Sequence, residues 1–316
     1  MHKLWKIDYA AVHDGPGVRT SFYYKGCPLR CLWCSNPEGQ TSSPDLVFEQ
    51  ARCIGCGLCE DACHNKAVEL RKNSDTRKIH INRTACDLCG ECSAVCATKA
   101  LEIWGRVYPL HELLEITEKN RLLYRKTGGG VTLTGGDPVC QLESVLELLD
   151  QCRERGIHTA METSAHADME GFERILEKID WLFIDIKHMD PEEHRRVTGK
   201  RNNLILQNVR RASMILGRRH RDLVIRMVVV PGINNGENIL RAAEFLGSLP
   251  HITGVQFLPY HDYGVVKYGL LDRSYPLQGL KPPSEDMMEG CRKIMTKYGL
   301  KQGGSITFDE SCSDGE

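Results

Sequence analysis

Eleven of the fifteen cysteines of this chain fall in three short runs, and these runs constrain the fold more than any other feature. Two runs, CIGCGLCEDAC (53–63) and CDLCGECSAVC (86–96), share the spacing C-x₂-C-x₂-C-x₃-C, and a third, CPLRCLWC (27–34), is C-x₃-C-x₂-C. The N-terminus has no apolar leader, so we expect a cytoplasmic protein with reduced thiols. Runs of reduced thiols indicate metal sites. We interpret the scattered Cys140, Cys152, Cys291 and Cys312 as ordinary thiols.

The two longer runs have the spacing of bacterial ferredoxins, in which three cysteines bind one 4Fe–4S cluster and the fourth crosses to a second cluster. Structural zinc also uses C-x₂-C pairs, but it combines two cysteines with two distant ligands. The repeat therefore favours two 4Fe–4S clusters over zinc. The expected ligands are Cys53, Cys56, Cys59 and Cys96 for cluster one, and Cys86, Cys89, Cys92 and Cys63 for cluster two.

The third run offers only three thiols, Cys27, Cys31 and Cys34. Three thiolates hold three irons of a 4Fe–4S cube and leave the fourth iron open, and an open coordination position is typical of a catalytic metal site. The sequence therefore predicts a third, site-differentiated cluster.

Charge and hydropathy exclude some function classes. Lys and Arg nearly balance Asp and Glu, with a net charge of −1, which gives no support for a nucleic-acid partner. No stretch of eighteen apolar residues is present, so we expect no membrane-spanning segment.

Apolar, β-rich runs alternate with amphipathic helical patterns over most of the chain. Such alternation predicts parallel βαβ units, as in a doubly wound sheet or a (β/α) barrel, and periodicity alone does not choose between them. The residues from about 48 to 108 interrupt it, so we expect an inserted ferredoxin-like domain at 48–108 and a main domain at 1–47 and 109–316. The six expected strands are 21–26, 130–134, 158–163, 181–187, 223–230 and 254–260.

Polar or glycine residues lie at the C-terminal ends of nearly all these strands, where active sites of parallel α/β folds assemble. They are Cys27, Gly135, Gly136, Asp137, Glu162, Thr163, Asp185, Lys187 and His261, with Arg226 inside its strand.

The third cysteine run, with Trp33 before its last cysteine, resembles that of the radical S-adenosylmethionine enzymes. Within them, HDGPGVRT (13–20), KGCPLRCLWCSNPE (25–38), GGGVTLTGGDP (128–138), FIDIKHMD (183–190), RMVVVPGINN (226–235) and LPYHDYG (258–264) resemble the activating enzymes of glycyl radical enzymes. The two-cluster insertion is similar to that of the branch which serves dehydratases, decarboxylases and related lyases.

This resemblance implies a partial (β/α)₆ barrel of the TIM type and an oxidoreductase. S-adenosylmethionine would chelate the open iron of the third cluster and be cleaved reductively to a 5′-deoxyadenosyl radical. That radical would take a hydrogen atom from a backbone glycine of a partner glycyl radical enzyme. The cofactors carry the chemistry, and the protein positions them.

The resemblance also implies roles for individual residues. Gly135, Gly136 and Asp137 match a Gly-Gly-Glu motif that meets the methionyl amino group, with Asp one methylene shorter than the family's Glu. The other matching positions are Lys187 and Arg226 for carboxylate or ribose oxygens, Glu162, Thr163 and Asp185 for ribose hydroxyls or a monovalent cation, His261 and Trp33 near the cofactor, Asn36 as a loop cap or cofactor contact, and Asp14 near the incoming glycine. Buried ion pairs are an alternative for the charged residues of this set.

Two other functions stay open: a radical enzyme acting on another substrate, and a ferredoxin-like electron-transfer protein. The open three-cysteine site argues against an electron carrier. The expected partners are a glycyl radical enzyme, with an arylacetate decarboxylase as the best match, and a flavodoxin or ferredoxin as electron donor. The protein itself is expected to be a monomer. The two extra clusters could relay electrons or help docking.

Overall fold

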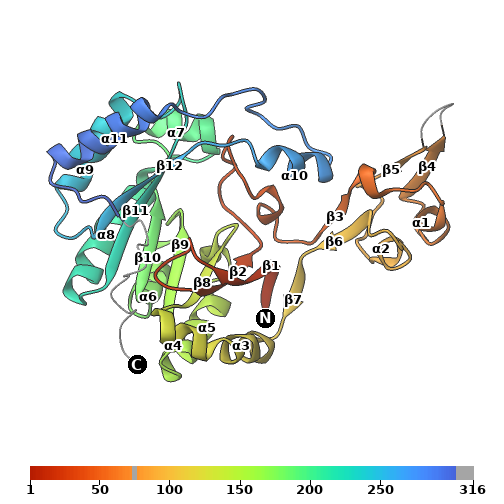
Figure 1. The fold of residues 1–316 in the computed structure, drawn as a ribbon, viewed down its shortest axis with the longest axis horizontal. Helices are drawn as coiled ribbons and strands as arrows, with labels where there is room; N and C mark the ends of the chain where they lie inside the picture. The colour runs from red at the N-terminus through yellow and green to blue at the C-terminus, as the bar shows by residue number, and fades with distance from the viewer. Residues whose placement is uncertain (73–76, 304–316) are drawn as a thin grey trace, which may run out of the picture.

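A computed structural model describes residues 1–72 and 77–303 of the chain, so Cys312 lies outside the described residues. Its centre is an eight-stranded sheet in the order β12-β11-β10-β9-β8-β2-β1-β7, which curves as an open barrel (Figure 1). The strands are β1 (His2–Ala11), β2 (Arg19–Tyr24), β7 (Arg106–Tyr108), β8 (Gly130–Gly135), β9 (His158–Thr163), β10 (Trp181–Asp185), β11 (Asp222–Val229) and β12 (Gly254–Pro259).

Six neighbouring strands, β2 and β8 to β12, run parallel, which confirms the α/β fold and the six expected strands. Most of their apolar residues are buried, and helices cover the outer face of the sheet (Figure 1). The helices of this domain are α3 (Leu110–Lys119), α4 (Arg121–Thr127), α5 (Leu142–Glu154), α6 (Met169–Leu176), α7 (Pro191–Thr198), α8 (Asn203–Arg218), α9 (Glu237–Gly247), α10 (Gly264–Leu270) and α11 (Glu285–Lys297).

Local signals in the sequence set the helix ends. Asp168, Asp190 and Ser284 precede α6, α7 and α11, and their side chains accept hydrogen bonds from backbone N–H groups of the first turns. Gly156 follows α5 with a φ of 63°, the left-handed conformation that ends many helices.

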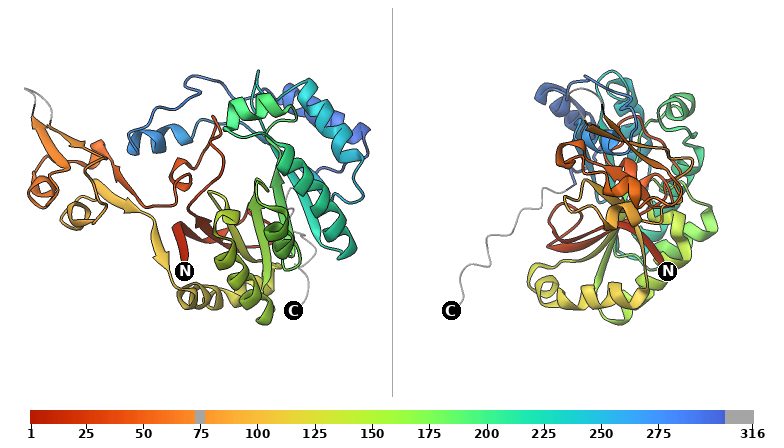
Figure 2. Two further views of the ribbon diagram at one scale, coloured as in Figure 1. Left: turned by 180° about the vertical axis from the view of Figure 1, so that it is seen from behind. Right: turned by 90° about the vertical axis from the view of Figure 1, so that its right-hand side faces the viewer.

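The insertion leaves the barrel on a two-stranded stem, in which β3 (Asp45–Phe48) pairs antiparallel with β6 (Leu101–Trp104). Beyond the stem lie α1 (Leu58–Asp61), β4 (Val68–Lys72), β5 (Arg77–Ile81) and α2 (Glu91–Ala94). The insertion projects as a separate lobe and has its own small core (Figures 1 and 2). β7 lies within the span 48–108, yet it pairs with β1 in the main sheet.

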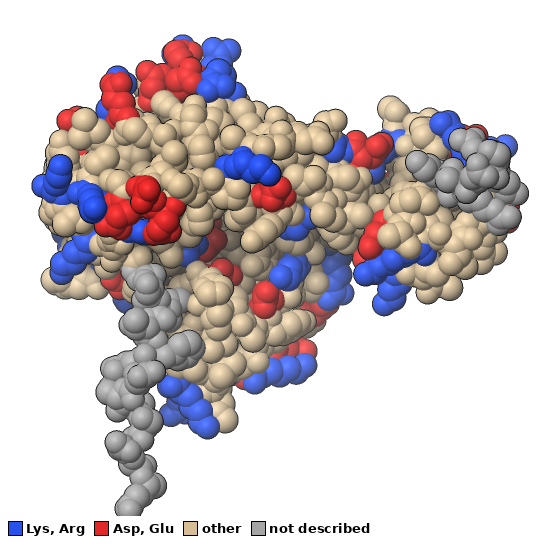
Figure 3. Space-filling model, turned by 45° about the horizontal axis from the view of Figure 1, so that its top comes forward, with Lys and Arg blue, Asp and Glu red and all other residues tan. Residues whose placement is uncertain are grey.

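Acidic and basic side chains are interspersed over the face shown in Figure 3, with no large area of one sign. Among the described residues, no helix is long and apolar enough to cross a membrane.

Candidate active site

A cavity of about 230 Å³ lies at the C-terminal ends of the six parallel strands. Every predicted residue of the main site lines it except Asp14. The predicted residues that line it are Cys27, Cys31, Trp33, Cys34, Asn36, Gly135, Gly136, Asp137, Glu162, Thr163, Asp185, Lys187, Arg226 and His261.

The three-cysteine loop follows β2 and is folded by its own backbone. Gly26 N–H donates to the carbonyls of Gly39 (2.8 Å) and Thr41 (2.9 Å), and Cys27 N–H donates to Gln40 (3.3 Å). These bonds bring the chain back on itself, so that Cys27, Cys31 and Cys34 share one cavity.

Trp33 anchors this loop by packing against other aromatic side chains. It packs in an aromatic group with Tyr260, Tyr268 and Tyr275, and its ring is almost fully buried. Its Nε1–H has no hydrogen-bond partner among the described residues although it is buried. A buried donor without a partner is costly, so its presence beside the three thiols is consistent with an acceptor that is supplied by a bound group.

The buried position of the three thiols favours metal binding. Burial raises the pKa of Cys31 to about 12 and also raises the pKa values of Cys27 and Cys34. Thiolates at this depth therefore need a cation at the sulfur atoms, which a bound metal provides. The donor set and the orphan Trp33 N–H fit an iron–sulfur cluster.

Gly135 and Gly136 let β8 approach the cysteine loop. A Cβ on Gly136 would lie 2.2 Å from the Gly39 carbonyl oxygen and 2.4 Å from that of Gly26, and Gly135 has a φ of 109°. Only glycine fits both positions. In this structure Gly136 permits close contact with the cysteine loop, and Gly135 permits close contact with the backbone of β2 at Tyr23 and Tyr24.

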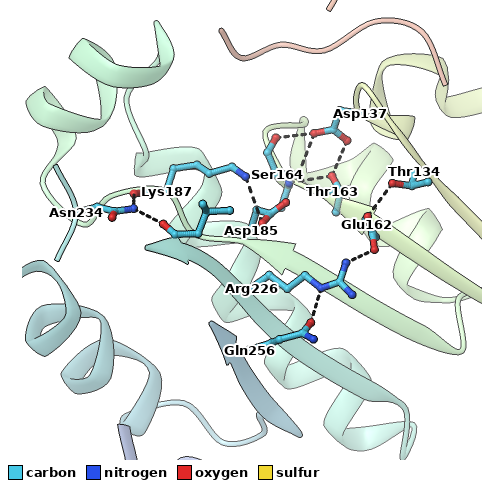
Figure 4. A network of polar contacts seen from close by, with 12 residues as sticks. Thr134, Asp137, Glu162, Thr163, Ser164, Asp185, Lys187, Arg226, Asn234 and Gln256 are labelled. Atoms are coloured by element: carbon cyan, nitrogen blue, oxygen red, sulfur yellow. Dashed lines mark hydrogen bonds and ion pairs between the residues drawn. The ribbon is translucent and has the colours of Figure 1, made fainter. Parts of the chain in front are cut away.

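The Asp137 carboxylate is buried and joins the ends of β8 and β9 (Figure 4). It accepts hydrogen bonds from Thr163 Oγ1 (2.7 Å), Ser164 Oγ (2.6 Å) and Ser164 N–H (2.9 Å). Burial raises the pKa of Asp137, and the Ser164 and Thr163 bonds partly offset this. The shorter acid therefore orders the cavity wall through its side chain, and Thr163 is engaged with it.

Glu162 and Arg226 form a buried ion pair across the cavity wall (Figure 4). Thr134 Oγ1 donates to Glu162 (2.7 Å), while Arg226 donates to Gln256 (2.7 Å) and to the carbonyl of His13 (2.9 Å). The Arg226 guanidinium also lies over the Phe183 ring, 3.7 Å from its centre. Arg226 thus fixes the N-terminal HDGPG segment to the barrel.

Lys187 pairs with Asp185, with 3.2 Å between Nζ and the carboxylate. Burial disfavours the charge of Lys187, but the Asp185 carboxylate and the nearby Cys31 outweigh burial and raise the pKa of Lys187. Asn234 holds the Lys187 backbone by donating to its carbonyl (3.0 Å). The cavity therefore contains a cation that stays charged at neutral pH.

Three predicted residues lie at the margin of the site. Asn36 Oδ1 accepts a hydrogen bond from Lys267 Nζ on α10 (2.9 Å), and His261 stacks on Tyr263 with 4.3 Å between ring centres. Asp14 accepts from Ser21 Oγ (2.6 Å) and lies outside the cavity lining.

The eight cysteines of the insertion separate into two pockets. One contains Cys53, Cys56, Cys59 and Cys96, and the other contains Cys63, Cys86, Cys89 and Cys92. Each pocket combines three cysteines of one run with the fourth cysteine of the other. Every cysteine that the structure describes is a free thiol.

Sequence reasoning missed several residues that build the site. Ser164 and Thr134 lie at strand ends beside predicted residues, a position that could have drawn attention to them. Glu38 and Lys267 gave no such signal, because their contact (2.6 Å) joins segments that are far apart in the chain.

Comparison with known proteins agrees with this geometry. The chain matches the Radical SAM superfamily over residues 85–246, a 4Fe-4S dicluster domain over 52–100 and a 4Fe-4S single cluster domain over 13–54. It is 36% identical to an indoleacetate decarboxylase activating enzyme of Tractidigestivibacter scatoligenes, over 94% of this chain and 95% of that one. It is 36% identical to a trans-4-hydroxy-L-proline dehydratase activating enzyme of Clostridioides difficile, covering 94% and 98% of the two chains. For a choline trimethylamine-lyase activating enzyme of Oleidesulfovibrio alaskensis the identity is 38%, covering 93% and 95%.

Proposed function

This chain belongs to the radical SAM activating enzymes of glycyl radical enzymes, and on that premise we propose how its residues divide the work. When bound, the iron–sulfur cluster and S-adenosylmethionine supply an electron and a 5′-deoxyadenosyl radical that takes hydrogen from a backbone glycine of the partner. The observation that carries the proposal is the single cavity in which three thiols, a glycine-lined strand end and a buried Lys187 meet.

In this proposal Cys27, Cys31 and Cys34 hold three irons of a site-differentiated cluster. Lys187 faces the carboxylate of S-adenosylmethionine, because a charged ammonium in a buried cavity is a strong partner for a carboxylate. The edge formed by Gly135 and Gly136 meets the methionyl amino group.

Glu162 and Asp185 are proposed as acceptors for the ribose hydroxyls. Each is already paired with a cation of the chain, Arg226 or Lys187, and this pairing competes with the predicted monovalent cation. Trp33, Asn36, Thr163 and His261 support or border the cofactor, and Asp14 orders the segment that the glycine approaches.

We further propose two 4Fe–4S clusters in the insertion, with the ligand sets Cys53, Cys56, Cys59, Cys96 and Cys63, Cys86, Cys89, Cys92. The two pockets of the insertion support these sets. We propose that the protein is a monomer that receives electrons from a ferredoxin or flavodoxin. Its proposed partner is a decarboxylase, dehydratase or lyase, and an arylacetate decarboxylase is the first partner to test.

The deciding experiment is anaerobic iron and sulfide counting, followed by electron paramagnetic resonance of the reduced protein with and without S-adenosylmethionine. We expect about twelve irons per chain, four for each cluster, and one signal that changes when S-adenosylmethionine is added. About eight irons and an unresponsive spectrum would contradict the catalytic site. Incubation with candidate glycyl radical enzymes and detection of the glycyl radical then identifies the partner.

A further inference from the structure

The two cysteine runs of the insertion differ at the positions that flank their exposed cysteine. Cys56 of the first run has Ile54 and Leu58 two residues to either side. Cys89 of the second run has Asp87 and Glu91 at the equivalent positions. The repeated spacing makes this an internal comparison of two sites with the same geometry and different surfaces.

At the first site the surface is apolar. Ile54 is 68% exposed, Leu58 52% and Val95 40%, and all three line the pocket of Cys56. We call these three residues the collar. A group of large apolar side chains that are exposed together often marks a contact surface.

The charged residues near the first site do not cover the collar. Glu60 and Asp61 do not line its pocket, and the Glu60 carboxylate accepts a hydrogen bond from Leu70 N–H (3.1 Å). Lys99, which follows the pocket residue Thr98, is exposed.

At the second site the surface is acidic. His64 bridges Asp87 (3.1 Å) and Glu91 (3.0 Å), so the acids are held beside Cys89. Carboxylates are expensive to dehydrate and repel an acidic partner, so this rim discourages close contact with one.

The two sites also differ in their distance from the barrel. The pocket of the second site contacts Leu46 and Ile103, which pair across the stem, while that of the first site contacts Phe48 and Leu101, the pair two residues further out. Two residues of a strand extend about 7 Å. The first site is therefore the outer one, in agreement with the position of α1 beyond α2 in Figure 1.

The root of the stem connects directly to the catalytic loop. Asp45, the first residue of β3, pairs with Lys25 (2.6 Å), and Lys25 lies two residues before Cys27. The three cysteine sites thus follow one another from the tip of the insertion to the cavity.

From this arrangement we propose that the collar docks an acidic ferredoxin, which delivers single electrons through the outer site and then the inner site to the Cys27 site. The inference rests on the proposed function. The ferredoxin is oxidised by one electron, each insertion cluster is reduced and reoxidised in turn, and the electron is consumed when the sulfur–carbon bond of S-adenosylmethionine breaks. A small apolar contact with charged margins suits a transient electron-transfer encounter.

The test replaces the collar with the residues of the second run. The Ile54→Asp/Leu58→Glu variant uses side chains that the same loop already carries at equivalent positions, and Leu122→Glu on α4, where Leu122 is 66% exposed, is the matched control. We would measure the Kd for an acidic two-cluster ferredoxin by calorimetry, which should rise together with the KM, and 5′-deoxyadenosine formation per bound iron without any partner enzyme, with that ferredoxin or with dithionite as reductant. We expect the KM for ferredoxin to rise about tenfold in the acidic variant and not in the control. The rate per bound iron with dithionite should be the same in the wild type, the acidic variant and the control.

A second variant, Ile54→Lys/Leu58→Lys, distinguishes docking from damage, because it should leave the KM for ferredoxin unchanged or lower it. An equal rise in both variants, or an unchanged KM in the acidic one, overturns the proposal. A rise seen with flavodoxin but not with ferredoxin overturns the choice of donor. If the wild-type protein forms no 5′-deoxyadenosine even with dithionite, the proposed function fails. If wild type and both variants behave alike with every reductant, only the docking surface fails.

Discussion

At the scale of single residues, Asp137 shows how a shortened side chain can gain a structural role. Its carboxylate accepts three hydrogen bonds from Thr163 and Ser164, with donor–acceptor distances of 2.6–2.9 Å. A longer acid would carry its oxygens past these donors. The cavity wall of this protein is thus held by the residue that departs from the family motif.

Asp137→Asn tests this role. An asparagine side chain keeps one acceptor oxygen but replaces the other with an NH₂ group, which faces the hydroxyl and N–H donors without accepting from them. We therefore expect the free energy of unfolding to fall by about 1.5–3 kcal/mol and the KM for S-adenosylmethionine to rise. Urea unfolding and product formation would measure both effects. Asp168→Asn is the control, because asparagine caps a helix as well as aspartate does. Equal stability of the two variants would contradict the role.

Buried histidines predict how stability depends on pH. His158 lies beside Arg19, with 3.3 Å between Nδ1 and Nη2, and burial together with Arg19 lowers the pKa of His158 to about 4. His158 therefore binds a proton near pH 6.5 in the unfolded chain, but in the native state it stays neutral down to about pH 4. Stability is complete above pH 6.5 and falls by up to about 1.4 kcal/mol per pH unit between 6.5 and 4.

The check is the urea midpoint of the wild type and of His158→Asn from pH 7.5 to 5. The variant should lose part of the acid-induced decrease, while His2 and His194 contribute to the remainder, because burial also lowers the pKa of His194 and lowers that of His2 to about 4. Parallel pH profiles for the two proteins would exclude His158 as a cause.

The membership of the site could be predicted from the sequence, but the pairing within it could not. Strand-end position identified Glu162, Asp185 and Lys187, because the C-terminal ends of parallel strands meet at one edge, whereas Arg226 lies inside its strand and was assigned through the family resemblance. The pairing of Glu162 with Arg226 depends on β9 and β11 flanking β10 in register, a relation that no local pattern contains. Asp14 was expected near the incoming glycine; it lies outside the cavity lining and accepts a hydrogen bond from Ser21 Oγ.

At the scale of elements, the stem is attached to the barrel by a buried charge network. Lys25 is 1% exposed and pairs with Asp45, and Asp45 also accepts from Arg273 (3.1 Å). Gly105 completes this joint, because a Cβ at that position would lie 2.6 Å from Lys25 Cδ. Strand β2, the stem and the segment after α10 therefore meet at one point.

Asp45→Ala should weaken this joint strongly. It leaves the buried Lys25 ammonium without its partner, which typically costs about 3–5 kcal/mol. Asp8→Ala, which breaks an exposed ion pair with Lys6, should cost no more than about 1 kcal/mol. Urea unfolding would compare the two, and similar losses would show that Lys25 is not electrostatically dependent on Asp45.

The elements also show which strands a pattern can reveal. The six parallel strands are short and, except for β12, mostly buried, and their predicted positions agree with the structure to within about two residues, the usual uncertainty of element boundaries. β7 was missed because it is a three-residue edge strand with mostly exposed residues, and β1, which lies between β2 and β7, because only two of its ten residues are buried. Their position depends on antiparallel pairing with distant segments.

At the scale of the whole molecule, the two lobes depend on different forces. The barrel has a large continuous aliphatic core, whereas the core of the insertion is small and includes Cys59 and Cys92 themselves. Such a lobe needs its metal for stability. The barrel core is built mainly from aliphatic residues, so we expect it to remain folded without iron.

Iron removal should therefore unfold the insertion before the barrel. After anaerobic chelation, we expect hydrogen exchange to increase strongly over residues 45–104 and to stay unchanged in β9, β10 and β11. Mass spectrometry of exchanged peptides would measure this. The contrary result, a uniform increase over both lobes, would mean that the clusters stabilise the barrel as well.

The geometry of the stem has a consequence for the history of the molecule. Asp45 and Trp104 are direct partners across β3 and β6, so the chain leaves and re-enters the barrel at neighbouring points. An insertion attached in this way is a cassette, which recombination can add, remove or exchange while the sheet keeps its path. If the insertion docks the electron donor as proposed, exchange of this cassette between relatives should transfer the preference for that donor.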